Sequence, residues 1–185
     1  MGKRNYIIFL FLVVFMAHGA QANAASMQDV VGTYYSMKFK DKFWIEGEGT
    51  LTDNNTGVGT VKENKKWTLK RNTNQGTLNY NGKCKVKGDK FIVKKTKSLR
   101  DQLEKKAIKR WLKLYVEDQG ETITDIKVTY STYKITKAKI NPEGPKSLQI
   151  ILKGTITGKV SGGVGRVNRK FKYQAKVIFG PRTAP

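Results

Sequence analysis

The chain has 185 residues and is strongly basic, with 36 lysines and arginines, 14 aspartates and glutamates and a formal net charge of +22. Its single histidine, His18, lies in an N-terminal segment that we expect to be removed. The mature chain would then lack imidazole, which excludes histidine acid–base catalysis, Ser–His and Cys–His nucleophile pairs and most zinc sites. We therefore predict a protein that is not an enzyme and that holds no cofactor and no metal.

The first 24 residues have the three parts of a secretory signal. Lys3 and Arg4 form a charged start, residues 6–17 form an apolar stretch, and Ala22 and Ala24 supply small residues for a signal peptidase. The apolar stretch has about 12 residues, whereas a membrane-spanning helix needs roughly 20. The sequence therefore predicts cleavage after Ala24 and export of the mature chain to the periplasm or outside the cell.

Residues 25–185 are long enough for one ordinary domain with a substantial core. The whole chain has four prolines, so no proline-rich linker divides it. We predict a single β-rich domain over residues 25–185.

Strands are indicated by alternation of apolar and polar side chains, which places every second residue on the same face of a sheet. The clearest run is near the C-terminus, where lysines alternate with apolar residues. In chain order, the apolar members of the main runs are Tyr35, Met37 and Phe39; Trp67 and Leu69; Ile126, Val128 and Tyr130; Leu148, Ile150, Leu152 and Ile156; and Phe171, Tyr173, Ala175, Val177 and Phe179.

Turn-forming residues are frequent between these runs, as in Asp53-Asn54-Asn55 and Asn81-Gly82. Asn81-Gly82 predicts a two-residue hairpin turn, because both residues tolerate positive φ. The fold class predicted from this pattern is mainly β: an antiparallel barrel or sandwich of short strands with one amphipathic helix in mid-chain.

The helix is predicted over Ser98 to Val116, with residues 98–101 as its N-terminal cap. At 100° per residue its apolar side chains gather in one sector and its lysines on the opposite side. Such a helix could lie on an anionic membrane, or it could cover the sheet and leave a solvated basic face. We expect the second arrangement, because a sheet with one apolar face needs a cover.

Cys84, the single cysteine, cannot form a disulfide within the chain. It alternates with Lys83 and Lys85 and shares its predicted face with Val86. The thiol could be activated by the lysines or cross-link to a partner, or it could be a small buried residue. The neighbouring valine favours burial.

The segment Val30-Val31-Gly32-Thr33-Tyr34-Tyr35 resembles the opening of a secreted lipocalin, in which a Gly-x-Trp signature begins the first barrel strand. Gly32 takes the place of the glycine, and Tyr34 stands where the tryptophan would be. The resemblance covers about six residues of the chain. It implies a β-barrel with a calyx for a small apolar ligand, and it assigns no ligand-binding residue.

Two hypotheses for function follow. The first is an exported binding protein that holds a lipid or another small apolar ligand in a cavity of the barrel or between sheets. The cavity would be lined by apolar side chains on the predicted inner faces, which are Tyr35, Met37, Phe39, Trp67, Phe171 and Tyr173.

The alternative is a surface that binds polyanions, such as an acidic polymer, or anionic membranes. Lysine favours contact with diffuse charge over bidentate recognition. The candidate anion-binding residues are Lys105, Lys109 and Lys113 on the helix and Lys170, Lys172 and Lys176 on the C-terminal strand. Nucleic acid is not expected, because alternation places Phe171 and Tyr173 on the face opposite the lysines. Both hypotheses remain open at the level of the sequence, which also gives no oligomeric state.

Overall fold

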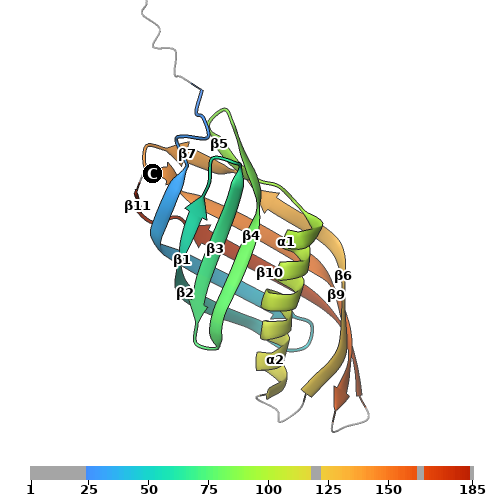
Figure 1. Ribbon diagram of the computed structural model, residues 1–185. Coiled ribbons are helices and arrows are strands. Elements are labelled where there is room, and N and C mark those ends of the chain that lie inside the picture. Colours follow the sequence, from blue (N-terminus) through green and yellow to red (C-terminus); the bar gives the residue numbers. More distant parts are fainter. Residues whose placement is uncertain (1–23, 118–121, 162–164, 184–185) are drawn as a thin grey trace, which may run out of the picture.

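The computed structural model describes residues 24–117, 122–161 and 165–183, and it confirms a mainly antiparallel β fold with one helix in mid-chain (Figure 1). The predicted signal segment lies outside the described residues except for Ala24. The strands are β1 (Gly32–Ile45), β2 (Gly49–Val61), β3 (Lys66–Thr73), β4 (Gly76–Lys87), β5 (Lys90–Val93), β6 (Thr122–Thr136), β7 (Ala138–Asn141), β8 (Gly144–Pro145), β9 (Ser147–Ser161), β10 (Gly165–Ile178) and β11 (Arg182–Thr183).

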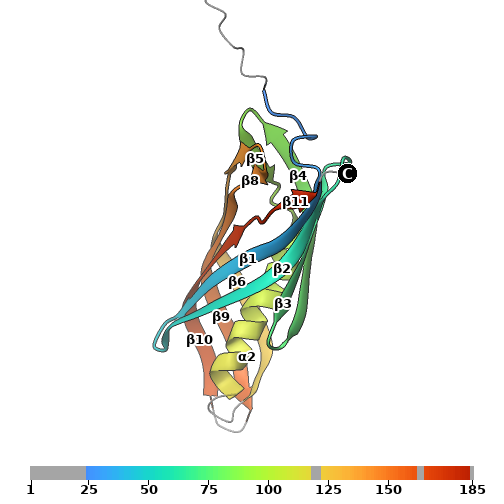
Figure 2. The ribbon, with the colours of Figure 1, turned by 90° about the vertical axis from the view of Figure 1, so that its left-hand side faces the viewer.

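The strands form a sheet in the order β6-β9-β10-β1-β2-β3-β4-β5-β7-β8, and β11 pairs with β1. The first and the last long strand, β1 and β10, therefore lie side by side near the middle of this order. The turn-forming residues led us to expect short strands, but several strands are long: β1 has 14 residues and β6 has 15. Neighbouring strands twist by about 20–25° relative to each other, and the long strands curl into a half-barrel (Figures 1 and 2).

Two turn predictions were wrong, because tertiary contacts hold the turn-forming residues in strands. β2 runs through Asp53-Asn54-Asn55, where the Asn55 side chain accepts a hydrogen bond from Nε of Arg71 at 2.8 Å. β4 runs through Asn81-Gly82. A Cβ atom on Gly82 would lie 3.0 Å from Nε1 of Trp67, so the glycine makes room for the indole ring.

A β-bulge in β1 changes which residues face inward. The register with β2 shifts between Tyr34 and Met37, and Ser36 has a φ of 52°. The extra residue breaks the alternation, so Tyr34 and Met37 are both fully buried while Tyr35 is 47% exposed. The expectation that Tyr35 faces the interior with Met37 and Phe39 was therefore wrong.

The helix consists of α1 (Lys97–Gln102), the π-helical segment η1 (Leu103–Ile108) and α2 (Lys109–Glu117). Its N-cap is Thr96, whose Oγ1 accepts a hydrogen bond from the backbone N–H of Leu99 at 3.0 Å, so the predicted cap over residues 98–101 was wrong.

The helix lies along the concave side of the sheet, between β4 and β6 (Figure 1). Its buried apolar side chains are Leu99, Leu103, Ala107, Ile108, Trp111 and Leu112. They form one core with the inward residues of the strands, as expected of a helix that covers a sheet. None of the described helices is long and apolar enough to cross a membrane.

Candidate anion-binding surface

The residues predicted to line an apolar cavity lie in the core, with the exception of Tyr35. Each of the other five is at most 3% exposed; they are Met37, Phe39, Trp67, Phe171 and Tyr173. The structure thus brings them to the concave side of the sheet from β1, β3 and β10.

The helix occupies the concave side of the sheet. The ring of Trp111 stacks on Phe43 of β1 with centroids 6.0 Å apart, and Phe43 in turn stacks on Phe171 at 6.2 Å. On β6, Tyr130 packs edge-on against Phe171 at 6.3 Å. These aromatic contacts tie the helix and three strands together, so the space that a calyx would offer is filled by side chains here.

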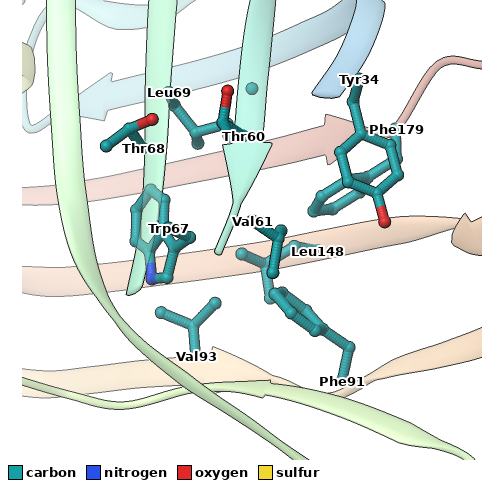
Figure 3. Close-up of a pocket in the computed structure, with 11 residues that line it drawn as sticks. Tyr34, Thr60, Val61, Trp67, Thr68, Leu69, Phe91, Val93, Leu148 and Phe179 are labelled. Carbon is teal, nitrogen blue, oxygen red and sulfur yellow. The ribbon is translucent and has the colours of Figure 1, made fainter. Parts of the chain in front are cut away.

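A small cavity remains at one end of the half-barrel, among Trp67, Val93, Phe91 and Leu148 (Figure 3). Its volume is about 10 Å³, which is room for roughly one water molecule. The cavity as it stands is too small for a lipid or a drug-sized ligand.

A buried polar cluster lies under the helix. The Arg71 guanidinium pairs with the Asp41 carboxylate, and the Tyr173 hydroxyl donates to the same carboxylate at 3.2 Å. Burial raises the pKa of the Asp41 carboxyl above its ordinary value, and the charge of Arg71 offsets part of this effect. Burial also raises the pKa of Tyr173 well above its ordinary value. The cluster therefore joins β1, β3 and β10 through one carboxylate.

A second arginine ties the helix to the cluster. Asp53 Oδ2 of β2 lies 3.6 Å from Nη2 of Arg71 and 2.9 Å from Nη2 of Arg110 on α2. Nη2 of Arg110 also donates to Asn74 Oδ1 at 3.3 Å. Arg110 follows Lys109 in the basic stretch of the helix, yet it is only 9% exposed. Its charge holds the helix in place and is not available at the surface.

The outer face of the sheet carries a groove of about 360 Å³ that spans strands β2, β1, β10 and β9. Lys40 and Lys42 of β1 and Lys176 of β10 line it, together with uncharged polar residues of β2, β9 and β10. The single acidic residue of the lining is Asp41, whose side chain is turned inward to Arg71. We call this site the β1–β10 groove; its charge is positive and it exposes no carboxylate.

The strand register places like charges opposite each other on this face. Lys40 is paired with Lys176 across β1 and β10, and Lys172 is paired with Lys153 across β10 and β9. Like charges directly opposite each other on neighbouring strands destabilise a sheet. The fold therefore tolerates an electrostatic cost on its outer face.

The six predicted anion-binding lysines do not form one surface. Lys176 lies in the β1–β10 groove, and Lys172 lies beside Trp44 and Lys153. Lys170 is exposed near the middle of β10, two residues before Lys172, and its backbone N–H donates to the carboxylate of Glu46 at 3.1 Å.

The helix lies on the concave side of the sheet (Figures 1 and 2). The β10 lysines alternate with buried residues such as Phe171 and Tyr173 and therefore lie on the opposite, outer face. Lys105 and Lys113 are exposed, and Lys109 is half-buried. Sequence reasoning did not include Lys40 and Lys42 in the site. The alternation of apolar and polar residues already placed Lys40 on the outer face. That β10 lies beside β1, and so brings Lys176 opposite Lys40, could not be inferred from the local pattern.

Cys84 lies in the core, as its alternation with lysine indicated. It is fully buried, and its Sγ lies 3.4 Å from the backbone oxygen of Lys65. Burial raises the pKa of the Cys84 thiol to about 11. A lysine-activated thiolate is therefore inconsistent with its surroundings.

No protein-family model and no curated protein matches the chain. Within the described ranges there is also no group of three or more His, Cys, Asp or Glu side chains placed to hold a metal ion.

Proposed function

We propose that the protein binds polyanions through the outer face of its sheet, with the β1–β10 groove at the centre of the binding surface. The observation that carries this proposal is that Lys40, Lys42 and Lys176 line one groove in which no carboxylate is exposed. Lysine ammonium groups attract negative charge without requiring a planar partner. The groove therefore suits a repetitive polymer with carboxylate, sulfate or phosphate groups.

The neutral residues of the groove narrow the class of polymer. Gln149, Gln174 and Asn54 supply amide groups, which both donate and accept hydrogen bonds. Ammonium groups alone would bind any anion. The amides beside them can also form hydrogen bonds with the hydroxyl groups of a ligand. An acidic glycan offers both kinds of group, and we propose it as the polymer.

The experiment is elution from heparin beads with a salt gradient, using the purified mature chain. The wild-type protein is expected to bind at low salt and to elute as salt rises, because exposed charges are screened over about 10 Å at 0.1 M ionic strength. The variant Lys40→Gln/Lys42→Gln/Lys176→Gln is expected to bind roughly tenfold more weakly, since an exposed ion contact contributes about 0.2–1 kcal/mol.

The matched control is Lys105→Gln/Lys109→Gln/Lys113→Gln, which removes the same charge from the helix. Its heparin affinity is expected to stay within about twofold of wild type, after the melting temperature shows that it is folded. Equal weakening by both triple variants would show a diffuse effect of net charge and would contradict a site in the groove.

Vesicles separate a polymer from a membrane as the partner. Trp44 lies outward on β1, is 37% exposed and is paired with Lys172. If the outer face rested on a bilayer, the fluorescence of Trp44 would shift to the blue on addition of vesicles that contain phosphatidylglycerol. With an acidic glycan as the partner we expect no such shift, and Trp44→Phe identifies the tryptophan responsible if one is seen.

A second candidate function is binding of a lipid or another apolar ligand between the helix and the sheet. The observation that favours it is that the buried side of the helix carries donors without a hydrogen-bond partner among the described residues: Nε and Nη1 of Arg110 and Nε1 of Trp111. A buried donor left unpaired costs about 1–3 kcal/mol. A ligand with an apolar tail and a polar head could satisfy these donors if the helix moved away from the sheet.

This candidate is tested by mass spectrometry of an organic extract of the protein purified from its native cell, and by titration with the neutral apolar dye N-phenyl-1-naphthylamine. A stoichiometric lipid, or saturable dye fluorescence that the lipid displaces, would support it. An empty extract together with no dye binding would contradict it and leave polyanion binding as the function.

A further inference from the structure

A second basic groove lies where the hairpin of β3 and β4 meets the start of the helix. Its volume is about 490 Å³. Lys62, Lys66 and Lys83 line it, and the hydroxyl groups of the lining belong to Thr68, Thr96 and Ser98. We call this site the β3–β4 groove, and it shares no lining residue with the β1–β10 groove.

The groove carries a positive charge that no acidic side chain of its lining neutralises. All three lysines are exposed, and none of the lining residues is acidic. Lys66 is directly opposite Lys83 across β3 and β4, which is again a destabilising pairing of like charges. Glu63, the residue after Lys62, lies outside the lining and accepts a hydrogen bond from Gln28 at 3.4 Å.

The hydroxyl groups at the helix start are set up as donors. Oγ1 of Thr96 accepts from the backbone N–H of Leu99 at 3.0 Å, and Oγ of Ser98 accepts from Nε2 of Gln102 at 3.0 Å. A hydroxyl has one proton and two lone pairs. Neither hydroxyl donates a hydrogen bond to another described residue, so the proton of each is available for a ligand.

Neighbouring contacts keep this wall of the groove in place. Gln102 also accepts from the backbone N–H of Asn81 at 2.9 Å and donates to the side chain of Asn81 at 3.3 Å. Ser98, Gln102 and Asn81 thus form a connected chain from the helix to β4. A ligand would meet groups that are already ordered, which lowers the entropic cost of binding.

We propose that the β3–β4 groove binds a single phosphate group. Three ammonium groups and hydroxyl donors, with no carboxylate, match a compact oxyanion that has several acceptor oxygens and two negative charges. The β1–β10 groove differs because the neutral polar side chains of its lining are mainly amides. This site goes beyond the proposed binding of polymers, since it recognises one group instead of a charged chain. The phosphate could be free or could be the head group of an anionic lipid.

The experiment is calorimetric titration of the mature chain with inorganic phosphate at constant ionic strength in sodium chloride. Saturable binding is expected, with a stoichiometry of one. The variant Lys66→Gln/Lys83→Gln is expected to weaken it tenfold or more. Ser98→Ala leaves the charge unchanged and is expected to weaken it about threefold to tenfold, which a purely diffuse effect of charge would not do.

Two controls define the outcome. The variant Lys105→Gln/Lys109→Gln removes the same charge elsewhere and is expected to leave phosphate affinity within twofold. If it weakens binding as much as Lys66→Gln/Lys83→Gln does, or if Ser98→Ala has no effect, the proposal of a discrete site is overturned.

Vesicles distinguish the two sources of phosphate. Binding of inorganic phosphate assigns the site to the free ion. Binding only to vesicles that contain phosphatidic acid, lost in Lys66→Gln/Lys83→Gln and absent with phosphatidylcholine, assigns it to a lipid head group. Binding to neither overturns the proposal. Heparin elution of Lys66→Gln/Lys83→Gln is expected to stay close to wild type, so failure here is distinct from failure of the β1–β10 groove.

Discussion

The side-chain oxygen of Gln102 accepts a hydrogen bond from the backbone N–H of Asn81 at 2.9 Å, so the helix takes the position of a neighbouring strand beside this part of β4. Lys106 makes a similar contact by donating to the backbone oxygen of Asn79. An unpaired strand edge exposes backbone groups that invite pairing with another chain. Here the helix satisfies two of these groups on β4, and its other side faces β6.

The first prediction concerns this contact. Replacing Gln102 by alanine is expected to lower the free energy of unfolding by about 1 kcal/mol, since a typical hydrogen bond contributes 0.5–1.5 kcal/mol. Urea denaturation measures the change, and hydrogen exchange of the Asn81 amide is expected to become faster. Lys105→Ala on the exposed side of the same helix is the control, with an expected change below about 0.5 kcal/mol. An unchanged exchange rate at Asn81 would mean that the helix does not protect the strand edge.

The second prediction concerns the buried cluster. Asp41→Asn leaves Arg71 with a buried charge and no carboxylate of comparable geometry, which is expected to cost about 3–5 kcal/mol. The double variant Asp41→Leu/Arg71→Met removes both charges and is expected to recover most of this loss. Thermal denaturation of the three proteins checks both statements. A double variant as unstable as the single one would show that shape, and not charge, decides the stability of this cluster.

The pH dependence of the same residue has a definite sign. Because the pKa of Asp41 is raised in the folded protein, its contribution to stability is complete below the ordinary carboxyl pKa of 3.8 and is lost as pH rises through the folded value. Asparagine does not titrate, so wild type is expected to gain stability relative to Asp41→Asn as pH falls from 7 to 3. Denaturation curves of both proteins at the two pH values would show this gain.

The third prediction concerns Cys84, whose pKa is raised to about 11 by burial. At pH 8 the folded protein is expected to react with iodoacetamide far more slowly than the urea-unfolded protein, because the thiolate is the reactive form and the side chain is covered. A raised thiol pKa contributes stability that is complete below pH 9 and lost as pH rises through 11. Cys84→Ala is expected to change stability by about 1 kcal/mol and to leave heparin binding intact. Fast alkylation of the folded protein would contradict burial of the thiol.

The fourth prediction concerns export. The charged start, the apolar stretch over residues 6–17 and the small residues before Ala25 predict a mature N-terminus at Ala25. N-terminal sequencing of material from the periplasm or the medium checks this. A sequence that begins at Met1 or Gly2 in exported material would mean that the segment is not cleaved.

Local pattern was sufficient to identify the parts of this protein. In the C-terminal strand, the alternation of Phe171 and Tyr173 with Lys170 and Lys172 identified both the strand and its inner face, because successive side chains of a strand point to opposite faces. The spacing of Leu99, Leu103 and the later apolar residues identified the helix, because residues three or four apart lie on the same face of a helix. The all-β class with one helix in mid-chain followed from these two periods.

Tertiary contacts decided how the parts meet. The bulge at Ser36 turned Tyr35 outward, and Arg71 held the turn-forming Asn55 in a strand. Both effects depend on a partner distant in sequence, which no local period encodes. Likewise, alternation placed Lys40 and Lys176 on outer faces separately. Only the antiparallel pairing of β1 with β10 set them opposite each other and so formed a basic groove, because strand order is a property of the whole chain.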